Sequence, residues 1–138
     1  MPDYTGPLPV PTPETRPYWE AVRRHVLELP RCRTCGCHFF YPRAACPRCL
    51  SGDLEWVAAS GRGTLHTFTV VHRGLRDFPL GTPYVIAIVE LAEGPRVMSN
   101  LVGVEPDPAR LRIGMPVEVV FDDVSAQATL PRFRPAPA

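Results

Sequence analysis

Residues 32–49 read CRTCGCHFFYPRAACPRC and hold all five cysteines of the chain. Four of them form two C-x-x-C pairs, Cys32 with Cys35 and Cys46 with Cys49, and ten residues separate the pairs. Because a C-x-x-C turn places two thiolates on one edge of a tetrahedron, two such pairs match the four-sulfur geometry that zinc prefers. Ten residues suffice for a hairpin that brings the second pair to face the first. The spacing predicts a rubredoxin-like zinc ribbon with a closed, structural metal site, and iron remains the other candidate metal.

The residues around the cysteines fit this prediction. Gly36 can adopt the positive φ that points backbone N–H groups at sulfur, and Ser51-Gly52 is expected to close the second pair in the same way. Cys37 and His38 could also be ligands, but two pairs already complete a four-coordinate site, so neither is expected to touch the metal. A disulfide is the alternative, and the odd number of cysteines and a cytoplasmic setting count against it. A redox C-x-x-C would need a thioredoxin-like βαβ context, which is not recognisable in the sequence.

The composition favours a small, β-rich protein. Of the 138 residues 45% are hydrophobic, and 18 prolines and 10 glycines interrupt them. This chain is too apolar for a disordered protein and too interrupted for a helical bundle. All 15 basic residues are arginine, which excludes catalysis by lysine. The net charge of +1 and the lack of a secretion signal or a long apolar run lead us to expect a soluble, cytoplasmic protein that binds no membrane.

Residues 1–29 are expected to form an extended arm followed by a helix. Five prolines fall within the first fifteen residues and favour an extended conformation. From Thr15 to about Leu29, apolar residues recur at steps of three and four, as on one face of a helix. Thr15 can cap this helix, and Pro30 is expected to end it. The ribbon is then expected over residues 30–52.

From residue 53 to residue 138 the pattern changes to short strands separated by glycine corners. Tyr84–Leu91 is apolar at both odd and even positions, which predicts a strand covered on both faces. The expected strands are Leu54–Ala59, Thr64–His72, Tyr84–Leu91, Arg96–Val102, Val117–Asp122 and Ala128–Phe133, with a helical turn within 106–113. Such strands favour a small, partly open barrel of OB type. The predicted fold is therefore mainly β, with an N-terminal helix, a zinc ribbon and a C-terminal OB-fold barrel.

Several short motifs follow one another in a defined order along the chain. They are Tyr18-Trp19, Cys32-Arg33-Thr34-Cys35-Gly36, Tyr41-Pro42-Arg43, Cys46-Pro47-Arg48-Cys49, Gly61-Arg62-Gly63-Thr64, Phe68-Thr69-Val70-Val71-His72, Pro83-Tyr84-Val85, Glu90-Leu91, Glu93-Gly94-Pro95-Arg96-Val97 and Ile113-Gly114-Met115-Pro116-Val117. From about residue 14 to 134, this ordered set resembles the acyl-CoA-associated family of zinc-ribbon plus OB-fold proteins, once catalogued as a domain of unknown function. The chain departs from that family at Tyr41, where many members carry a second proline, and at Arg24-His25-Val26, which replaces a glycine-containing turn.

The resemblance implies a role beside a larger enzyme. Members of that family commonly act as accessory subunits or appended domains of thiolase-superfamily enzymes, such as thiolases, hydroxymethylglutaryl-CoA synthases, acyltransferases and the aldolases that shorten steroid side chains. Some act beside a MaoC-type hydratase. The small subunit stabilises its partner and helps to line the channel for the pantetheine arm of acyl-CoA, while the reacting groups belong to the larger chain. We therefore expect a non-catalytic subunit of an acyl-CoA-processing complex.

The residues themselves favour the same interpretation. Asp122 and Asp123 are adjacent, so on a strand they point to opposite faces and make a poor acid/base pair. His66 and His72 have no recognisable acidic or serine neighbour in the sequence. We therefore expect no catalytic residue in this chain. An enzyme that acts alone on a CoA ester is the remaining catalytic alternative.

The candidate contact residues are mostly aromatic. Five of them are expected either to pack within the chain or to dock on an enzyme partner: Tyr18, Trp19, Phe39, Phe40 and Tyr41. In the loop over residues 73–82, Arg76 and Phe78 are candidates for contact with acyl-CoA or with the partner.

Arginines offer a second kind of contact. The ribbon carries Arg31, Arg33, Arg43 and Arg48 without an acidic residue, and a guanidinium group suits phosphate oxygens or the carboxylates of a partner. A single-stranded nucleic-acid-binding protein is the alternative function, because zinc ribbons and OB barrels both occur in such proteins. The barrel half is net acidic and poor in aromatic residues, so nucleic acid is not the expected partner.

Overall fold

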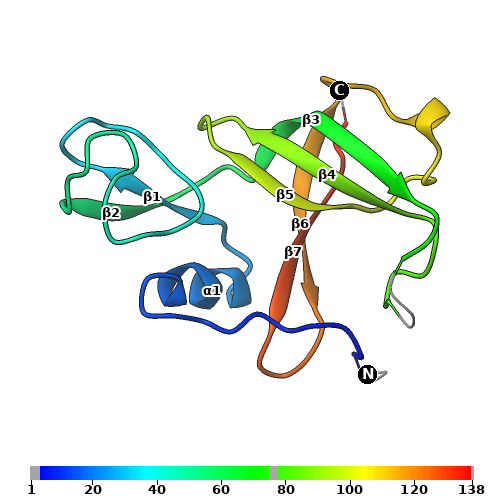
Figure 1. Cartoon of the computed structure of the whole chain (residues 1–138), viewed down its shortest axis with the longest axis horizontal. Coiled ribbons are helices and arrows are strands. Elements are labelled where there is room, and N and C mark those ends of the chain that lie inside the picture. Colours follow the sequence, from blue (N-terminus) through cyan, green and yellow to red (C-terminus); the bar gives the residue numbers. More distant parts are fainter. Residues whose placement is uncertain (1–3, 75–77, 138) are drawn as a thin grey trace.

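Five strands close into a barrel, and a two-stranded sheet lies beside it (Figure 1). The computed structural model describes residues 4–74 and 78–137. The elements in chain order are α1 (Arg16–Arg23), β1 (Glu28–Cys32), β2 (Leu54–Ala58), β3 (Arg62–Val71), β4 (Tyr84–Leu91), β5 (Arg96–Leu101), the 3-10 turn η1 (Pro108–Arg110), β6 (Pro116–Asp123) and β7 (Thr129–Pro135). Within those two described stretches, no helix is both long and apolar enough to cross a membrane.

The barrel is closed through β7, and its strands follow the order β3-β4-β5-β7-β6. β7 pairs antiparallel with β6 and meets β5 in parallel at Phe133 and Leu101. The N–H of Val102 donates a 2.7 Å hydrogen bond to the carbonyl of Phe133 at this junction. Closure removes the open edges that a sheet of this size would otherwise expose. The predicted fold class is confirmed, although the barrel is closed rather than partly open.

Strand β2 belongs to the small sheet and not to the barrel. It pairs antiparallel with β1, from Ala58 opposite Glu28 to Leu54 opposite Cys32. The prediction of a barrel strand over residues 54–59 is therefore wrong, because the partner of β2 is the strand that leads into the first cysteine pair. We propose that the ribbon unit extends through β2, so that the boundary expected after residue 52 lies too early.

Helix α1 ends at Arg23, well before the predicted end at Leu29. The N–H of His25 donates to the carbonyl of Val22 at 2.9 Å, and the N–H of Val26 donates to the carbonyl of Ala21 at 3.0 Å. These two bonds form a Schellman motif, whose left-handed position is usually a glycine but is here His25 with a φ of 61°. His25, and not Pro30, therefore ends the helix, and the chain continues as an extended strand.

The buried side chains form two cores. The larger core joins α1 to the barrel and contains Tyr18, Val22, Leu27, Leu29, Leu65, Val85, Ala87, Val89, Leu91, Val97, Leu101, Leu111, Val117 and Phe133. The smaller core lies in the ribbon and contains Cys32, Phe39 and Cys46, with Leu54 packed against it. Strand β1 contributes Leu29 to the first core and Cys32 to the second, because residues three positions apart on a strand face opposite sides.

Part of the outer face of β4 and β5 is apolar. Ile88 on β4 lies opposite Met98 on β5, and Met98 is 71% exposed. Ile86 lies on the same side of β4, and both isoleucines are half-buried. We call these three residues the β4–β5 face. The prediction that Tyr84–Leu91 is covered on both faces is therefore wrong, because its inner face is buried and its outer face is partly exposed in the described part of the chain.

A histidine–aspartate contact fixes the end of α1 to the barrel. Nε2 of His25 lies 2.9 Å from Oδ1 and 3.0 Å from Oδ2 of Asp123 on β6, and the imidazole stacks on Phe121 with ring centroids 5.2 Å apart. The hydroxyl of Thr129 donates a 2.6 Å hydrogen bond to Asp123. Thr129 and then His25 stabilise the ionised carboxylate, which lowers the pKa of Asp123 below its ordinary value of 3.8.

We expect acid to weaken the folded state through Asp123. Because its pKa is lower in the folded than in the unfolded chain, its contribution to the free energy of unfolding is fully present above the unfolded value and is lost as pH falls through the folded value. Asp123→Asn should therefore flatten the loss of stability as pH falls below about 5. Urea unfolding of both proteins across this range measures the effect. Identical pH profiles would contradict it.

Candidate metal centre and the ribbon–barrel cleft

The four predicted ligands lie together at one end of the ribbon. The sulfur atoms of Cys32, Cys35, Cys46 and Cys49 are all within 4.8 Å of one another. Across the two pairs, Sγ of Cys32 lies 3.5 Å from Sγ of Cys49, and Sγ of Cys35 lies 3.6 Å from Sγ of Cys46. A tetrahedral zinc site with bonds of about 2.3 Å has edges of about 3.8 Å. The sulfur cluster therefore fits a zinc ion with little adjustment.

The two cysteine pairs are held by equivalent turns. The N–H of Gly36 donates to the carbonyl of Cys32 at 2.8 Å, and the N–H of Leu50 donates to the carbonyl of Cys46 at 2.9 Å. Gly36 and Leu50 both have positive φ, 77° and 65°. The sequence predicts this conformation at Gly36 only, since leucine seldom adopts it. In the second turn the positive φ falls on Leu50, two positions before Gly52, whereas Ser51 does help to close the turn, because its carbonyl accepts the N–H of Cys46 at 2.8 Å.

Backbone N–H groups make the site favourable for thiolates. The N–H of Cys35 points at Sγ of Cys32 at 3.5 Å and is the main cause that lowers the pKa of Cys32 to about 6. At Cys35 the N–H of Cys37 acts in the same direction, but burial and the neighbouring sulfurs outweigh it and raise the pKa. A cation removes this conflict, because four close thiolates can all ionise only around a compensating charge.

Cys37 and His38 lie outside the four-sulfur cluster. The thiol of Cys37 donates to the carbonyl of His38 at 3.1 Å. Both residues line a cleft of about 490 Å³ between the ribbon and the β4–β5 turn, together with Phe40, Arg48 and Glu93. In this ribbon–barrel cleft, Oε2 of Glu93 accepts the N–H of Ser60 at 2.9 Å, whereas Oε1 is buried without a hydrogen-bond partner among the described residues.

We expect Cys37→Ser to retain the full metal content of the wild type. The reason is that the other four sulfurs already close a four-coordinate site and Cys37 faces the ribbon–barrel cleft. Elemental analysis of the purified variant measures the metal-to-protein ratio. A ratio that falls with this substitution would show that Cys37 is a ligand.

The arginines of the ribbon are partly neutralised by acids from the next segment. Arg31 pairs with Glu55 at 2.8 Å, and Arg33 pairs with Asp53 at 2.9 Å and with Glu55 at 3.4 Å. The sequence could not indicate these pairs, because they form only when β2 lies against β1. Of the other two, Arg43 donates to the carbonyl of Tyr41 at 3.2 Å, and Arg48 lines the ribbon–barrel cleft. Fewer free guanidinium groups are therefore available for nucleic-acid phosphates than the sequence suggests.

The aromatic candidates form one continuous row from α1 to the ribbon. Ring centroids lie 5.0 Å apart for Trp19 and Tyr18, 5.4 Å for Tyr18 and Phe40, and 5.1 Å for Phe40 and Tyr41. Tyr18 and Phe39 are buried in the two cores, and Trp19 and Phe40 are half-buried. Tyr41 is 44% exposed, so it is the member of this set most open to a partner.

The remaining candidates lie on the barrel. Arg76 falls outside the described residues, and Phe78 stacks on Tyr84 with ring centroids 4.4 Å apart. Nδ1 of His66 lies 3.8 Å from Oε2 of Glu90, and His72 is exposed.

Asp122 and Asp123 have different partners. Asp122 pairs with Arg132 at 3.0 Å, and Asp123 pairs with His25 at 2.9 Å. The two carboxylates therefore act in separate contacts, as expected from their positions on one strand.

Two family models match consecutive parts of the chain. Residues 19–55 match the rubredoxin-like zinc ribbon domain of ChsH2, and residues 56–122 match the C-terminal OB-fold domain of ChsH2. Together with the cysteine geometry, the first match confirms the prediction of a zinc ribbon whose four cysteines are positioned to bind a metal ion.

The curated relatives of this chain differ in length. A DUF35 domain-containing scaffold protein of Methanocaldococcus jannaschii is 40% identical over 105 residues, which cover 75% of this chain and 73% of that protein. A probable enoyl-CoA hydratase alpha subunit of Thermomonospora curvata is 39% identical over 119 residues, which cover 86% of this chain and 36% of that protein. The chain thus spans about a third of the length of that relative. The benzoylsuccinyl-CoA thiolase subunit BbsA of Geobacter metallireducens is 36% identical over 73 residues, which cover 53% of this chain and 48% of that protein.

A solved structure matches nearly the whole chain. A chain described as Ltp2-ChsH2(DUF35) aldolase has a TM-score of 0.84 and 36% identity, and the match covers 94% of this chain and 99% of that chain. Its ribbon and barrel therefore have the same relative arrangement as here. By these matches over both of its parts, the chain belongs to the DUF35 family of proteins that join a ChsH2-type zinc ribbon to an OB-fold domain.

Proposed function

We propose that this chain is a non-catalytic accessory subunit that binds and stabilises a thiolase-fold enzyme of the thiolase or steroid side-chain aldolase type. The observation that carries this proposal is the end-to-end match with a chain of the Ltp2-ChsH2(DUF35) aldolase, at a TM-score of 0.84. The names of the scaffold and thiolase-subunit relatives support the same role. The free thiols of the metal site suit the reducing cytoplasm, where we place the protein.

The β4–β5 face is the surface that we assign to the enzyme partner. Met98 is 71% exposed at its centre, next to Ile86 and Ile88. An apolar sheet face that its own chain leaves open is typical of a surface that a partner covers. Burial of such side chains contributes about 25 cal/mol per Å² of apolar surface.

We further propose that the ribbon–barrel cleft forms part of the acyl-CoA channel of the assembled complex. The cleft combines an apolar ring, Phe40, with the guanidinium group of Arg48, and it also contains the carboxylate of Glu93. An apolar ring beside a guanidinium group suits a flexible chain that carries a phosphate. The name of the relative from Thermomonospora curvata, a probable enoyl-CoA hydratase alpha subunit, supports a MaoC-type hydratase as a further partner.

Co-expression with a thiolase-fold subunit tests the assembly. We expect the two chains to co-purify as one complex, and we expect Met98→Asp to weaken the complex at least tenfold in Kd, because a carboxylate would be buried against apolar groups. Val10→Asp is the matched control, since Val10 is 84% exposed on the N-terminal arm, away from the β4–β5 face. Lack of co-purification by the wild type would refute the proposed function. Equal binding by both variants would refute the assigned face alone.

A further inference from the structure

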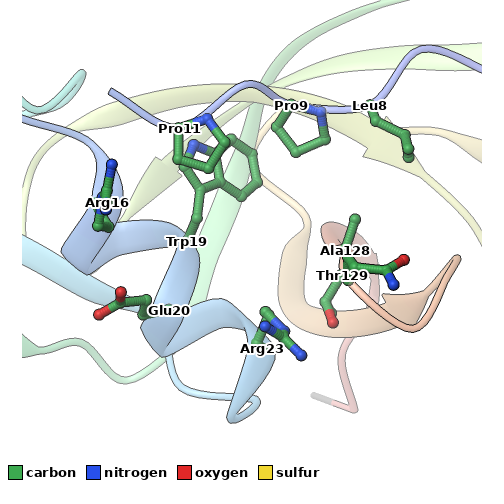
Figure 2. A pocket seen from close by; sticks show the side chains of 10 residues that line it. Leu8, Pro9, Pro11, Arg16, Trp19, Glu20, Arg23, Ala128 and Thr129 are labelled. Carbon is green, nitrogen blue, oxygen red and sulfur yellow. The ribbon is translucent and has the colours of Figure 1, made fainter. Parts of the chain in front are cut away.

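A second cavity lies at the opposite side of α1 from the ribbon, under the N-terminal arm. Its volume is about 430 Å³. Leu8, Pro9 and Pro11 of the arm cover it, α1 forms its floor, and Ala128 and Thr129 at the start of β7 close its side (Figure 2). We call it the arm cavity. It shares no lining residue with the ribbon–barrel cleft or with the cysteine cluster.

The charged side chains along the cavity floor carry a net positive charge. Arg16, Glu20 and Arg23 line the cavity from one face of α1, because residues four and seven positions apart lie on the same side of a helix. Nη2 of Arg23 donates to the carbonyl of Ala126 at 3.1 Å. Among residues 4–74 and 78–137, neither arginine forms an ion pair with Glu20. Two cations and one anion therefore favour a ligand with a single negative charge.

The indole of Trp19 offers both an apolar wall and an unused donor. Trp19 lines the cavity beneath Pro11 (Figure 2). Its Nε1 is buried and has no hydrogen-bond acceptor among the described residues. A buried donor without an acceptor is unusual in a native protein and indicates a missing partner.

We propose that the arm cavity binds a small amphipathic monoanion, namely a carboxylate with an aliphatic or aromatic body. The carboxylate accepts hydrogen bonds from Trp19 Nε1 and from the guanidinium groups, and the apolar body lies between Leu8, Pro9 and Ala128. The cavity volume falls within the range of about 300–1,000 Å³ that is common for small-ligand sites. This inference does not depend on the proposed enzyme partner, because every group involved belongs to this chain.

The N-terminal arm can open the cavity without breaking regular secondary structure. Pro7, Pro9 and Pro11 have no N–H group to donate. Leu8 is 48% exposed although it covers the cavity. The arm is held at its base, where the N–H of Thr12 donates to Oγ1 of Thr15 at 2.8 Å. Movement of the arm about Thr12 and Thr15 gives a ligand access to the buried Nε1 of Trp19.

Octanoate and octan-1-ol form a matched pair of probes for the isolated chain. We expect octanoate to shift the indole N–H resonance of Trp19 downfield in a saturable way, since its carboxylate provides the missing acceptor. The chain has two tryptophans, so Trp56→Phe identifies the Trp19 signal. Octan-1-ol has the same apolar body without the charge, and we expect it to bind at least tenfold more weakly. No saturable shift with octanoate up to about 10 mM, or equal binding of the two probes, would overturn the proposal.

Two substitutions locate the binding to the arm cavity. Arg16→Gln should weaken octanoate binding about tenfold, whereas Arg110→Gln, at an exposed arginine on η1, should leave it unchanged. Ala128→Leu should abolish binding by filling the cavity. Because this variant could also disturb the β6–β7 turn, its melting temperature is measured beside the titration, and Arg16→Gln provides the test that does not depend on it. Wild-type binding by Arg16→Gln would overturn the assignment of the site.

Discussion

Replacing Cys46 with serine is expected to release the metal ion and to unfold the ribbon. The buried core of the ribbon consists of Cys32, Phe39 and Cys46, and so small a core cannot offset the entropy of ordering the chain. Binding of a structural zinc ion supplies roughly 10–16 kcal/mol in comparable small sites, so its loss should remove most of the stability of this unit. We expect the metal-to-protein ratio to fall from one to near zero and the amide resonances of the ribbon to lose their dispersion.

Cys37→Ser is the matched control for this experiment. It also replaces a sulfur atom with oxygen in the same hairpin, but at a cysteine outside the four-sulfur cluster. Co-purification with a thiolase-fold subunit should weaken with Cys46→Ser and persist with Cys37→Ser. A folded ribbon that binds no metal in the wild type, or a Cys46→Ser variant with full metal content, would contradict the structural role of the ion.

Replacing Phe133 with alanine is expected to lower the free energy of unfolding by about 3–5 kcal/mol. The side chain is 2% exposed in the main core, and its backbone joins β7 to β5 and β6. A domain of this size has a total stability of about 5–15 kcal/mol, so the variant should lose a fifth or more of it. Urea unfolding followed by fluorescence measures the change.

Met98→Ala is the matched control for the barrel, since Met98 is an exposed residue on the neighbouring strand β5. We expect it to change the free energy of unfolding by less than about 0.5 kcal/mol. A similar loss of unfolding free energy in both variants would contradict the role of Phe133 at the junction of β7 with β5 and β6.

The features that could be predicted from the sequence depend on residues close together in the chain. The two C-x-x-C pairs specify the metal cluster, since each turn is built by four consecutive residues. The barrel strands follow from short apolar segments between turn residues, as at Tyr84–Leu91, although the structure buries only every second residue of that strand. Family membership follows from the order of these local motifs, and the comparisons confirm it.

The features that could not be predicted depend on distant contacts or on unusual backbone conformations. The partner of β2 lies more than twenty residues earlier, on β1, so its local pattern cannot distinguish ribbon from barrel. His25 and Leu50 adopt positive φ although neither is glycine, and no local signal marks them. The arm cavity combines residues 8–11, 16–23 and 127–129, which meet only in the folded chain.

Strand β1 is shared by the two cores, with Leu29 in one and Cys32 in the other. Only two residues of an extended segment separate the ligand Cys32 from Leu29 in the main core, so we expect a loss of order at one end to be transmitted to the other. Under the proposed function, metal availability in the cell would then control how many copies of this chain are competent to assemble with the enzyme partner. During zinc starvation, the proposed complex would lose activity even though the partner itself contained every group it needs to react.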